Sequence, residues 1–361
     1  MIKLDELIKE YCPDGVEYKE LQNVLKIKNG RDYKTFGEGE YPVYGSGGIL
    51  TYIDHFVYDK PSVLIPRKGS IDKLYYVDKP FWNVDTIFYT EINTDLILPR
   101  YVYHCLLREH LEKLNTAGGV PSLTQKVLNK VKLPVPPLEV QREIVRVLDS
   151  FTLLTAELTA ELTARKNQYN FYRDKLLTFD NEVKIVPLAE IADIGTGSSN
   201  TNEGIEEGEY PFYVRSQEPL RKNDYEYDET AIITAGDGVG VGKVFHYVEG
   251  KYALHQRAYR IHINTPDVLP RYYFHYMRSA FLPYIQKTMF QGSVASIRRP
   301  MLNQFPVPVP TLDVQKRLVN VLDNFEAICT DLNIGLPAEI EARQKQYEYY
   351  RDKLLSFKEK N

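Results

Sequence analysis

The chain has 361 residues, with 45 Lys and Arg against 49 Asp and Glu, so it is long enough for two or three domains and its net charge of −4 identifies no partner. It has no run of 18 apolar residues and no signal-peptide layout at its start, which argues for a cytoplasmic protein rather than a membrane or secreted one. Its three cysteines are odd in number and far apart, which argues against a disulfide framework and a zinc site.

Residues 1–135 predict a first globular domain. Leu4–Tyr11 has the spacing of a short amphipathic helix, and Pro13-Asp14-Gly15 follows it as a turn. Short strand-like runs punctuated by Gly and Pro fill Tyr18–Tyr89, as in a strongly bent sheet. Leu98–Leu114 predicts a single helix on this sheet.

Residues 136–179 predict one long helix. Its apolar residues recur at steps of three and four, which is the pattern of a coiled-coil seam. They are Val140, Ile144, Val147, Phe151, Leu154, Leu158, Leu162, Tyr169, Tyr172 and Leu176. About 40 helical residues would make a rod of roughly 60 Å, and such a stripe needs a partner in water.

The second half of the chain repeats this plan. Residues 180–309 predict a second globular domain, in which Glu209–Tyr213 answers Glu40–Tyr44. Residues 310–361 repeat the long helix, although Gly335-Leu336-Pro337 interrupts it. The fold class is therefore α/β (α+β), with two globular domains separated by two long helices. We expect the two apolar stripes to pair within the chain as an antiparallel coiled coil, with a pseudo-two-fold internal repeat.

A tandem four-residue unit lies inside the first long helix. Leu154–Glu157 is followed by Leu158–Glu161 and then by Leu162-Thr163-Ala164. Each unit is close to one helical turn and carries one leucine of the seam, so the number of units sets the length of the helix. The alternative is that the repeat is only a good helix-forming sequence whose length does not matter.

Two motifs that occur twice carry a family resemblance. Each helix begins after a run of prolines with Val-Gln, at Val140-Gln141 and Val314-Gln315, and each ends in Tyr-Arg-Asp-Lys-Leu-Leu, at Tyr172–Leu177 and Tyr350–Leu355. Over its whole length the chain resembles the specificity subunit of type I restriction–modification enzymes. The resemblance implies two target-recognition domains, each reading one half of a bipartite site in double-stranded DNA. It also implies that the helices set the spacing and dock two methyltransferase subunits.

The same resemblance implies a subunit without catalytic residues. Methyl transfer and cleavage would belong to partner chains, including restriction or translocase subunits, which would bind S-adenosylmethionine, ATP and Mg. The residues agree, since the sequence has no Asp/Asn-Pro-Pro-aromatic motif, no HExxH and no GxSxG. Gly236–Lys243 fails as a P-loop because Val244 stands where Ser or Thr is required. It predicts a tight β-turn, which either lets DNA approach the bare backbone or simply turns the chain.

Polar and basic residues at matching places in the two domains predict DNA contacts. Lys and Arg neutralise phosphates, and Arg, Lys, Asn, Gln and His read base edges. The candidates are Arg31, Lys34, Arg67, Lys68, Lys73, Asn83, Gln125 and Lys126 in the first domain, and Arg215, Arg221, Lys222, Lys243, His255, Gln256, Arg257, Gln291, Arg298 and Arg299 in the second. Any one of them could instead be a solvated surface charge. A coiled-coil adaptor with two protein-binding domains and no nucleic-acid role is the alternative function.

The helix ends predict a second surface, for partner subunits. Aromatic side chains with arginines are typical of protein interfaces. The candidates are Arg165, Tyr169, Tyr172 and Arg173 in the first helix, and Arg343, Tyr347, Tyr350 and Arg351 in the second. The alternative is that the tyrosines only fill the coil where it widens. We expect no metal site.

Overall fold

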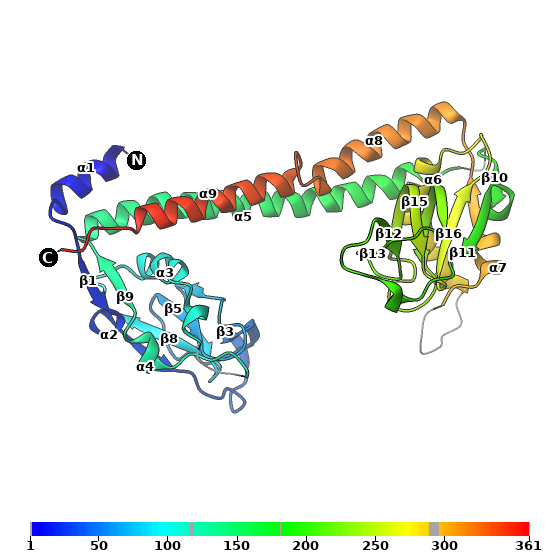
Figure 1. Cartoon of the computed structure of the whole chain (residues 1–361). Coiled ribbons are helices and arrows are strands. Elements are labelled where there is room, and N and C mark those ends of the chain that lie inside the picture. Colours follow the sequence, from blue (N-terminus) through cyan, green and yellow to red (C-terminus); the bar gives the residue numbers. More distant parts are fainter. Residues whose placement is uncertain (1, 116–118, 181, 289–295, 361) are drawn as a thin grey trace. The chain divides into compact units, whose positions relative to one another are not determined.

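The computed structural model describes residues 2–115, 119–180, 182–288 and 296–360, and the chain forms two compact units (Figure 1). Unit 1 comprises Met1–Leu158 and Ile340–Asn361, and unit 2 comprises Thr159–Glu339. The division falls inside two helices, so each unit holds one globular domain together with parts of the long helices.

Unit 1 contains the following elements, with α5 and α9 continuing into unit 2: α1 (Ile2–Tyr11), β1 (Glu17–Glu20), α2 (Leu21–Val24), β2 (Leu25–Asn29), β3 (Glu38–Gly45), β4 (Gly48–Ile53), β5 (Ser62–Pro66), β6 (Tyr75–Val77), β7 (Trp82–Asn83), β8 (Ile87–Ile92), α3 (Pro99–Arg108), the 3₁₀ helix η1 (Leu111–Leu114), α4 (Gln125–Leu128), β9 (Lys132–Val135), α5 (Leu138–Leu176) and α9 (Leu336–Leu354).

Unit 2 contains the following further elements: β10 (Ile185–Pro187), the 3₁₀ helices η2 (Leu188–Glu190) and η3 (Thr201–Glu203), β11 (Ala192–Thr196), β12 (Tyr210–Tyr213), β13 (Leu220–Lys222), β14 (Tyr227–Ala235), β15 (Phe245–Leu254), β16 (Ala258–Ile263), α6 (Pro270–Thr288), α7 (Arg299–Asn303), β17 (Pro306–Pro308) and α8 (Leu312–Thr330).

The two globular domains share one topology. In unit 1 the strands form a sheet of order β2-β8-β5-β6, a second sheet β4-β3-β7 and a ribbon β1-β9. In unit 2 the order β11-β16-β14-β15-β12-β13 contains the counterparts of both sheets, with the ribbon β10-β17 beside it. In unit 2 the single long strand β15 pairs with both β14 and β12. In unit 1 two separate strands take these places, since β6 pairs with β5 and β7 pairs with β3. Pro80 lies between β6 and β7, where its missing N–H cannot join a ladder.

The predicted α/β fold with long helices is confirmed. One helix of each domain covers the sheet, since α3 contacts β5 and β6 while α6 contacts β14 and β15. The hydrophobic core of each unit continues from the sheet through this helix to the long helices, as Val140 and Ile144 of α5 show in unit 1. The predicted break in the second long helix is also present, because α8 ends at Thr330 and α9 begins at Leu336 with Pro337 in its first turn.

The long helices pack in opposite directions. Within unit 2, Tyr172 of α5 lies 6.2 Å from Phe325 of α8 between ring centroids, whereas the earlier Lys166 lies near the later Cys329. In unit 1 the matching contact is the stacking of Phe151 on Tyr350, with ring centroids 5.2 Å apart. Part of the predicted seam therefore meets other helices, whereas Val314, Val321 and Ile328 of α8 are 40%, 41% and 48% exposed.

The helix predicted over Leu98–Leu114 is wrong in its extent. The structure has α3 over Pro99–Arg108 and a separate 3₁₀ turn over Leu111–Leu114. His110 lies between them with φ of 49°, in the left-handed region that ends a helix. The prediction ran past this break because Leu111 and Leu114 continue the apolar spacing, and both pack on the same core as α3, with Leu111 buried and Leu114 partly buried.

A buried glutamine fixes the start of each long helix to its domain. In unit 1 the Gln141 side chain accepts a hydrogen bond from the Leu98 N–H at 2.8 Å. Its amide nitrogen donates to the carbonyl oxygens of Leu96 at 3.0 Å and Pro136 at 2.7 Å. One side chain thus satisfies three backbone groups at a place where α3 and α5 both begin.

Gln315 repeats this arrangement in unit 2. It accepts from the Leu269 N–H at 2.8 Å and donates to the carbonyl oxygens of Asp267 at 2.7 Å and Pro310 at 2.8 Å. The Val-Gln motif that occurs twice in the sequence is therefore a structural joint between domain and helix.

We predict that Gln141→Leu lowers the free energy of unfolding by roughly 2 kcal/mol, because it leaves backbone groups at the joint without partners. Thermal or urea unfolding of the full chain measures this. The matched control is Arg142→Leu, whose side chain is mostly exposed and pairs with Glu139 on the helix surface. That change should stay within about 0.5 kcal/mol. Equal losses in the two variants would contradict the role given to Gln141.

Candidate nucleic-acid interface

The glycine-rich segment of unit 2 is a turn between two strands. It connects β14, which ends at Ala235, to β15, which begins at Phe245, so the prediction of a turn rather than a P-loop is confirmed. Gly238 has φ of +81° and Gly242 has φ of +69°, which few side chains tolerate. The following Val239 is 95% exposed at the tip of the turn.

Asp237 in this turn holds two arginines. Its carboxylate accepts from Arg215 at 2.6 Å and from Arg257 at 3.1 Å. Burial opposes ionisation of Asp237, but the two guanidinium groups outweigh it and keep the pKa of the carboxyl below its ordinary value. The carboxylate therefore fixes the direction of both arginines and cancels part of their charge.

The neighbouring Gln256 stands at the same edge of the domain. Its backbone N–H donates to the Ser199 carbonyl at 3.0 Å, and its side-chain amide donates to Asn200. Gln256 and Arg257 are exposed, and together with Asp237, Tyr259 and other residues they line a shallow hollow. Amide and guanidinium groups of this kind can form paired hydrogen bonds with adenine and guanine edges.

The other predicted residues of unit 2 are scattered. Lys243, Arg298 and Arg299 are exposed, and the last two lie at the start of α7. Arg221 donates to the Gly208 carbonyl at 2.6 Å, which makes it part of the fold. Lys222 is held by Glu203 at 2.8 Å and by Asp224 at 3.3 Å. Gln291 lies outside the described residues.

Unit 1 builds its corresponding edge from different residues. Lys68 pairs with Ser122 as Asp237 pairs with Ser296 in unit 2, which places the two loops at equivalent positions. The Leu123 N–H donates to the carbonyl of Arg67 at 2.9 Å, so the loop that follows Ser122 is tied to the end of β5. Lys68 is exposed and Arg67 is half-buried over a phenylalanine ring.

The start of α4, which holds Gln125 and Lys126, completes this edge in unit 1. Gln125 donates to Asn29, the last residue of β2, at 3.3 Å. Arg31 follows two residues later, and its carbonyl accepts from the Trp82 ring N–H at 3.0 Å while its own side chain is exposed. Lys126 is exposed beside Gln125, and Lys34 and Lys73 are exposed in neighbouring loops.

Two predicted DNA contacts are buried. Asn83 is 0% exposed and donates to the Ile87 carbonyl at 2.7 Å. His255 is 4% exposed, and its ring nitrogen accepts from the Arg257 N–H at 2.9 Å. Both side chains support loops that hold exposed candidates, and their burial keeps them out of reach of DNA.

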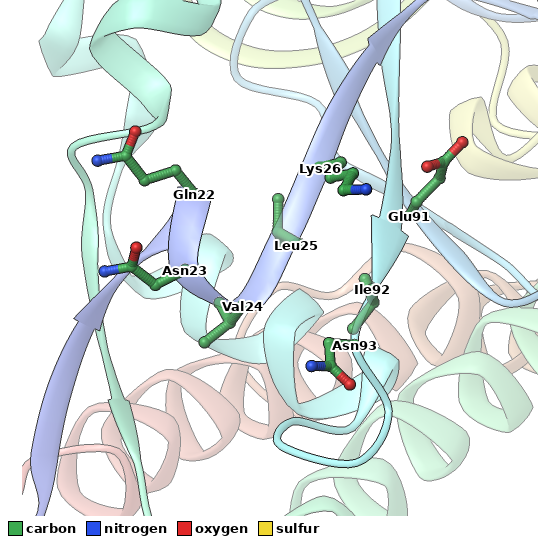
Figure 2. Close-up of a pocket in the computed structure, with 8 residues that line it drawn as sticks. All are labelled: Gln22, Asn23, Val24, Leu25, Lys26, Glu91, Ile92 and Asn93. Carbon is green, nitrogen blue, oxygen red and sulfur yellow. The ribbon is translucent and has the colours of Figure 1, made fainter.

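A separate hollow in unit 1 lies at the other end of β2 (Figure 2). Its lining residues are Gln22, Asn23, Val24, Leu25, Lys26, Glu91, Ile92 and Asn93. Lys26 and Glu91 face each other across the β2–β8 pair, and the Asn93 N–H donates to the Val24 carbonyl at 2.9 Å. The predicted DNA contacts lie towards the opposite end of β2, near Asn29.

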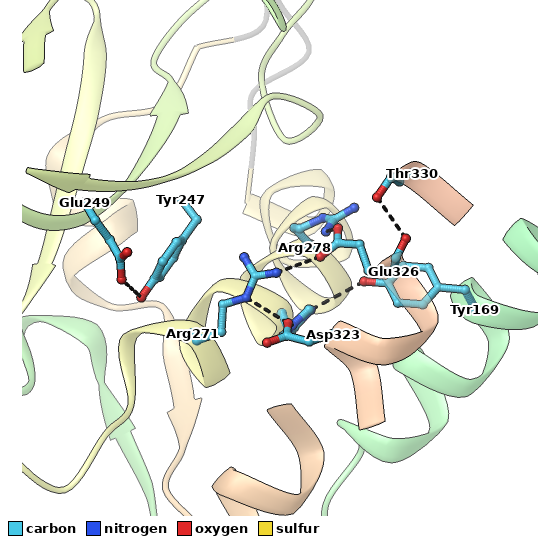
Figure 3. Close-up of polar contacts among 9 residues, drawn as sticks. Tyr169, Tyr247, Glu249, Arg271, Arg278, Asp323, Glu326 and Thr330 are labelled. Atoms are coloured by element: carbon cyan, nitrogen blue, oxygen red, sulfur yellow. Dashed lines mark hydrogen bonds and ion pairs between the residues drawn. The ribbon is translucent and has the colours of Figure 1, made fainter. Parts of the chain in front are cut away.

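A polar cluster that sequence reasoning missed lies where the domain helix packs on the long helices. In unit 2 the ring of His275 on α6 contacts Asp323 of α8 at 2.7 Å and the Tyr169 hydroxyl of α5 at 3.4 Å. Arg271 also donates to Asp323, at 2.8 Å, and to Glu326, at 2.9 Å (Figure 3). The helix that covers the sheet is thereby joined to both long helices of the unit.

The same cluster recurs in unit 1. His104 on α3 contacts Asp149 at 2.8 Å and the Tyr347 hydroxyl at 2.9 Å, and Arg100 donates to Asp149 at 2.8 Å. Burial lowers the pKa of His104 and of His275, so both rings are neutral near pH 7. Burial opposes ionisation of Asp149, but hydrogen bonds from His104 and Arg100 lower the pKa of its carboxyl. In this state each histidine donates to its aspartate and accepts from its tyrosine.

His275, Asp323 and Glu326 form the group of metal-ligand type among the described residues, with ligand atoms within 4.8 Å of one another. Arg271 neutralises Asp323, and both Arg271 and Arg278 bind Glu326. Two guanidinium groups at this point oppose a cation. The ion pairs therefore give a sufficient account of the cluster.

The predicted partner surface divides into buried and exposed residues. Tyr169 and Tyr347 are each 5% exposed and Arg351 is 7% exposed, since they belong to the packing just described. Of the remaining members, Arg165 and Tyr172 are exposed, and Arg173, Arg343 and Tyr350 are partly buried. Contact with a partner stays a prediction for these five. For the three buried side chains, filling the coil is the role that their packing supports.

Comparison with known proteins decides the family. The sequence profile described as the type I restriction modification DNA specificity domain matches residues 13–165 and again residues 180–342. The chain belongs to this family. The two matches agree with the internal repeat, and the family predicted from the helix motifs is confirmed.

Relatives in this family align along nearly the whole chain. The chain is 35% identical to the specificity subunit of type I restriction enzyme EcoR124I/EcoR124II of Escherichia coli, with 98% of this chain and 96% of that protein covered. It is 28% identical to a putative type I restriction enzyme specificity subunit of Haemophilus influenzae, with 95% and 96% covered. The crystal structure of a type I restriction–modification S subunit from M. genitalium matches 94% of the chain with a TM-score of 0.61 and 14% identity, which is a likeness of fold.

The missed residues of the polar clusters share one signal, which is the internal repeat. Arg100, His104 and Asp149 have counterparts in Arg271, His275 and Asp323, and the repeat could have paired them. Asp237 has no such signal, because its counterpart in the other domain is Lys68.

Within the part of the chain that the structure describes, no helix is both long enough and apolar enough to span a membrane.

Proposed function

We propose that this chain is the DNA-reading subunit of a type I restriction–modification complex, in which each globular domain reads one half of a bipartite site in duplex DNA. One observation supports this proposal above all: both domains present basic and amide side chains on equivalent loop edges. The Lys68–Ser122 and Asp237–Ser296 pairs mark these edges. Their topology is shared while their residues differ. Two edges of one design with different side chains suit two different half-sites.

The long helices would supply the spacing and the docking surface. Arg165, Tyr172, Arg173, Arg343 and Tyr350 combine arginine with aromatic rings at two corresponding helix ends, which supports one methyltransferase subunit at each. Those subunits would bind S-adenosylmethionine, and restriction or translocase subunits would bind ATP and Mg. The residues of this chain would bind and position DNA and leave the chemistry to the partners.

The function is tested by sequencing methylated adenines in a host with and without this chain. We expect one split sequence to gain adenine methylation in both halves only when the chain and its methyltransferase partner are both present. The purified chain alone should neither methylate nor cleave DNA. Turnover by the chain alone would contradict the proposal. An unchanged methylation pattern together with no salt-sensitive binding to duplex DNA would favour a protein adaptor instead.

Variants at one loop edge should affect one half-site. We predict that Arg257→Ala or Gln256→Ala costs on the order of 1–3 kcal/mol of binding and relaxes recognition at one half only, because base contacts are local. Lys68→Ala should affect only the other half. Binding of the assembled complex to DNA libraries randomised in each half measures both effects.

The matched control is Lys184→Gln, which removes an exposed positive charge beside the ribbon β10-β17. We expect both half-sites to remain as specific as in the parent. If Arg257→Ala and Lys68→Ala each weaken both half-sites equally, these side chains contact phosphate or only support the fold.

The length of α5 should set the unread spacer between the half-sites. The helix is continuous through Leu154–Ala164, so inserting one Leu-Thr-Ala-Glu after Glu161 adds about 6 Å and roughly preserves the seam. Along DNA this is one to two base pairs at roughly 3.4 Å each. We predict that the insertion keeps both half-sites and lengthens the spacer by one or two base pairs.

Methylome sequencing of the insertion variant beside the parent measures the spacer. The accompanying rotation of roughly 35° per base pair would be absorbed by the DNA or by the partner subunits. An active variant with an unchanged spacer would mean that α5 does not set the distance.

A further inference from the structure

An exposed valine lies at the loop edge of each globular domain. Among the large apolar side chains that the structure describes, Val239 is the most exposed in unit 2, at 95%, and Val120 is the most exposed in unit 1, at 69%. A single apolar side chain on a surface is common and needs no explanation. The positions of these two do, because both lie beside the edges that present the basic and amide candidates.

The two valines flank equivalent backbone pairs from opposite sides. Ser122 and Asp237 belong to the pairs that mark the two edges, one in each domain. Val120 stands two residues before Ser122 on the loop, whereas Val239 stands two residues after Asp237 on the turn. The internal repeat of the sequence therefore does not match the two valines, and their common position exists only in the folded domains.

The glycine-rich turn holds Val239 firmly on its edge. The Lys243 and Val244 N–H groups both donate to the Gly240 carbonyl, at 3.0 Å and 2.9 Å. A Cβ atom at Gly240 would lie 2.5 Å from the carbonyl oxygen of Arg215, so the turn packs directly on the segment that holds this arginine. Val239 and Arg215 line the same hollow. Because valine has few rotamers, fixing its side chain against a ligand costs little conformational entropy.

A backbone hydrogen bond holds the loop at Val120 in a similar way. The Gly69 N–H donates to the Pro121 carbonyl at 3.1 Å, which places Val120 beside the segment that holds Lys68. In both domains an exposed aliphatic side chain therefore stands next to basic groups on one edge.

The chemistry of base edges identifies what such a side chain can contact. In the major groove the base pairs present hydrogen-bond donors and acceptors, and the 5-methyl group of thymine is the apolar exception. A valine placed on this methyl group removes apolar surface of both from water. Gln256 and Arg257, on the same edge as Val239, suit hydrogen bonds to the neighbouring base edges. Under the proposed function each half-site contains an adenine to be methylated, so each half offers at least the thymine paired with it.

We propose that Val239 and Val120 are specificity-determining residues, each of which recognises one thymine by contact with its 5-methyl group in the half-site that its domain reads. The inference rests on the proposed function and deepens it, since it assigns one type of base to one named side chain in each domain. The valine favours thymine over cytosine, which lacks the methyl group.

The experiment removes only this methyl group. Deoxyuridine pairs as thymine does but has no 5-methyl group, and it replaces each thymine of the split site in turn. Binding of these duplexes to the assembled complex of the chain and its methyltransferase is measured. We expect one replacement in each half to weaken binding roughly fourfold, as for the loss of one buried methyl group. Val239→Ala should abolish this difference only in the half read by unit 2, and Val120→Ala only in the other half.

Ile185→Ala is the matched control, because Ile185 is an exposed aliphatic side chain of unit 2 that lies on the ribbon β10-β17. It should keep the full preference for thymine over deoxyuridine in both halves. Val239 and Val120 are exposed, so their replacement by alanine should leave the thermal unfolding of the chain unchanged.

The outcomes separate this inference from the proposed function. If the parent complex does not bind the split site, both fall. If it binds and methylates the site but no deoxyuridine changes its affinity, or the change persists in the alanine variants, only this inference falls. If Val239→Ala weakens binding of thymine and deoxyuridine duplexes equally, or prevents assembly with the methyltransferase, the valine contacts the DNA backbone or the partner protein, and the inference falls as well.

Discussion

Each globular domain depends on a polar joint that ties it to the long helices. A glutamine at the helix start satisfies three backbone groups, and a histidine in the domain helix bonds to an aspartate and a tyrosine from the two long helices of its unit. Hydrogen bonds of this kind are directional, and the glutamine and histidine side chains that form them are fully buried, so they fix orientation in a way that apolar packing cannot. The proposed spacer role of the long helices would need this fixed orientation, because a helix sets a distance only if its ends are held.

The joint also explains why the helices diverged less than the domains. Gln141 bonds to three backbone groups, and His104 bonds to Asp149 and Tyr347. Gln315 and His275 make the same bonds in unit 2, so few other side chains would satisfy these partners. The loop edges carry no such mutual requirement. Lys68 and Asp237 occupy equivalent backbone positions with opposite charges, and each is compatible with its own neighbours. Under the proposed function, a repeated scaffold whose loop edges differ would let one fold read two sequences.

The Asp237 cluster shows how an acidic residue can order basic side chains at the edge that we propose reads DNA. Its carboxylate holds Arg215 and Arg257 at 2.6 Å and 3.1 Å, so both guanidinium groups have a fixed direction. Part of their charge is cancelled, which weakens attraction to phosphates in general and leaves geometry to decide binding. The exposed Val239 at the tip of the same turn and the amide of Gln256 beside it add shape and hydrogen-bonding groups to that edge.

The sequence by itself determined the repeat, the long helices and the family, because periodic apolar spacing and recurring motifs are local properties of the chain. It also determined the break before Leu336, since Pro337 fits a first turn but not a helix interior. It missed the break at His110, where a left-handed residue interrupts an unbroken apolar pattern. Only the tertiary structure decided that Asn83 and His255 are buried, that Tyr169 and Tyr347 bond to histidines, and that Val140 is covered while Val314 is not. Burial depends on which distant segments pack on a residue, and α1 has no counterpart among the described elements of unit 2, so two positions that match in the repeat come to differ in exposure.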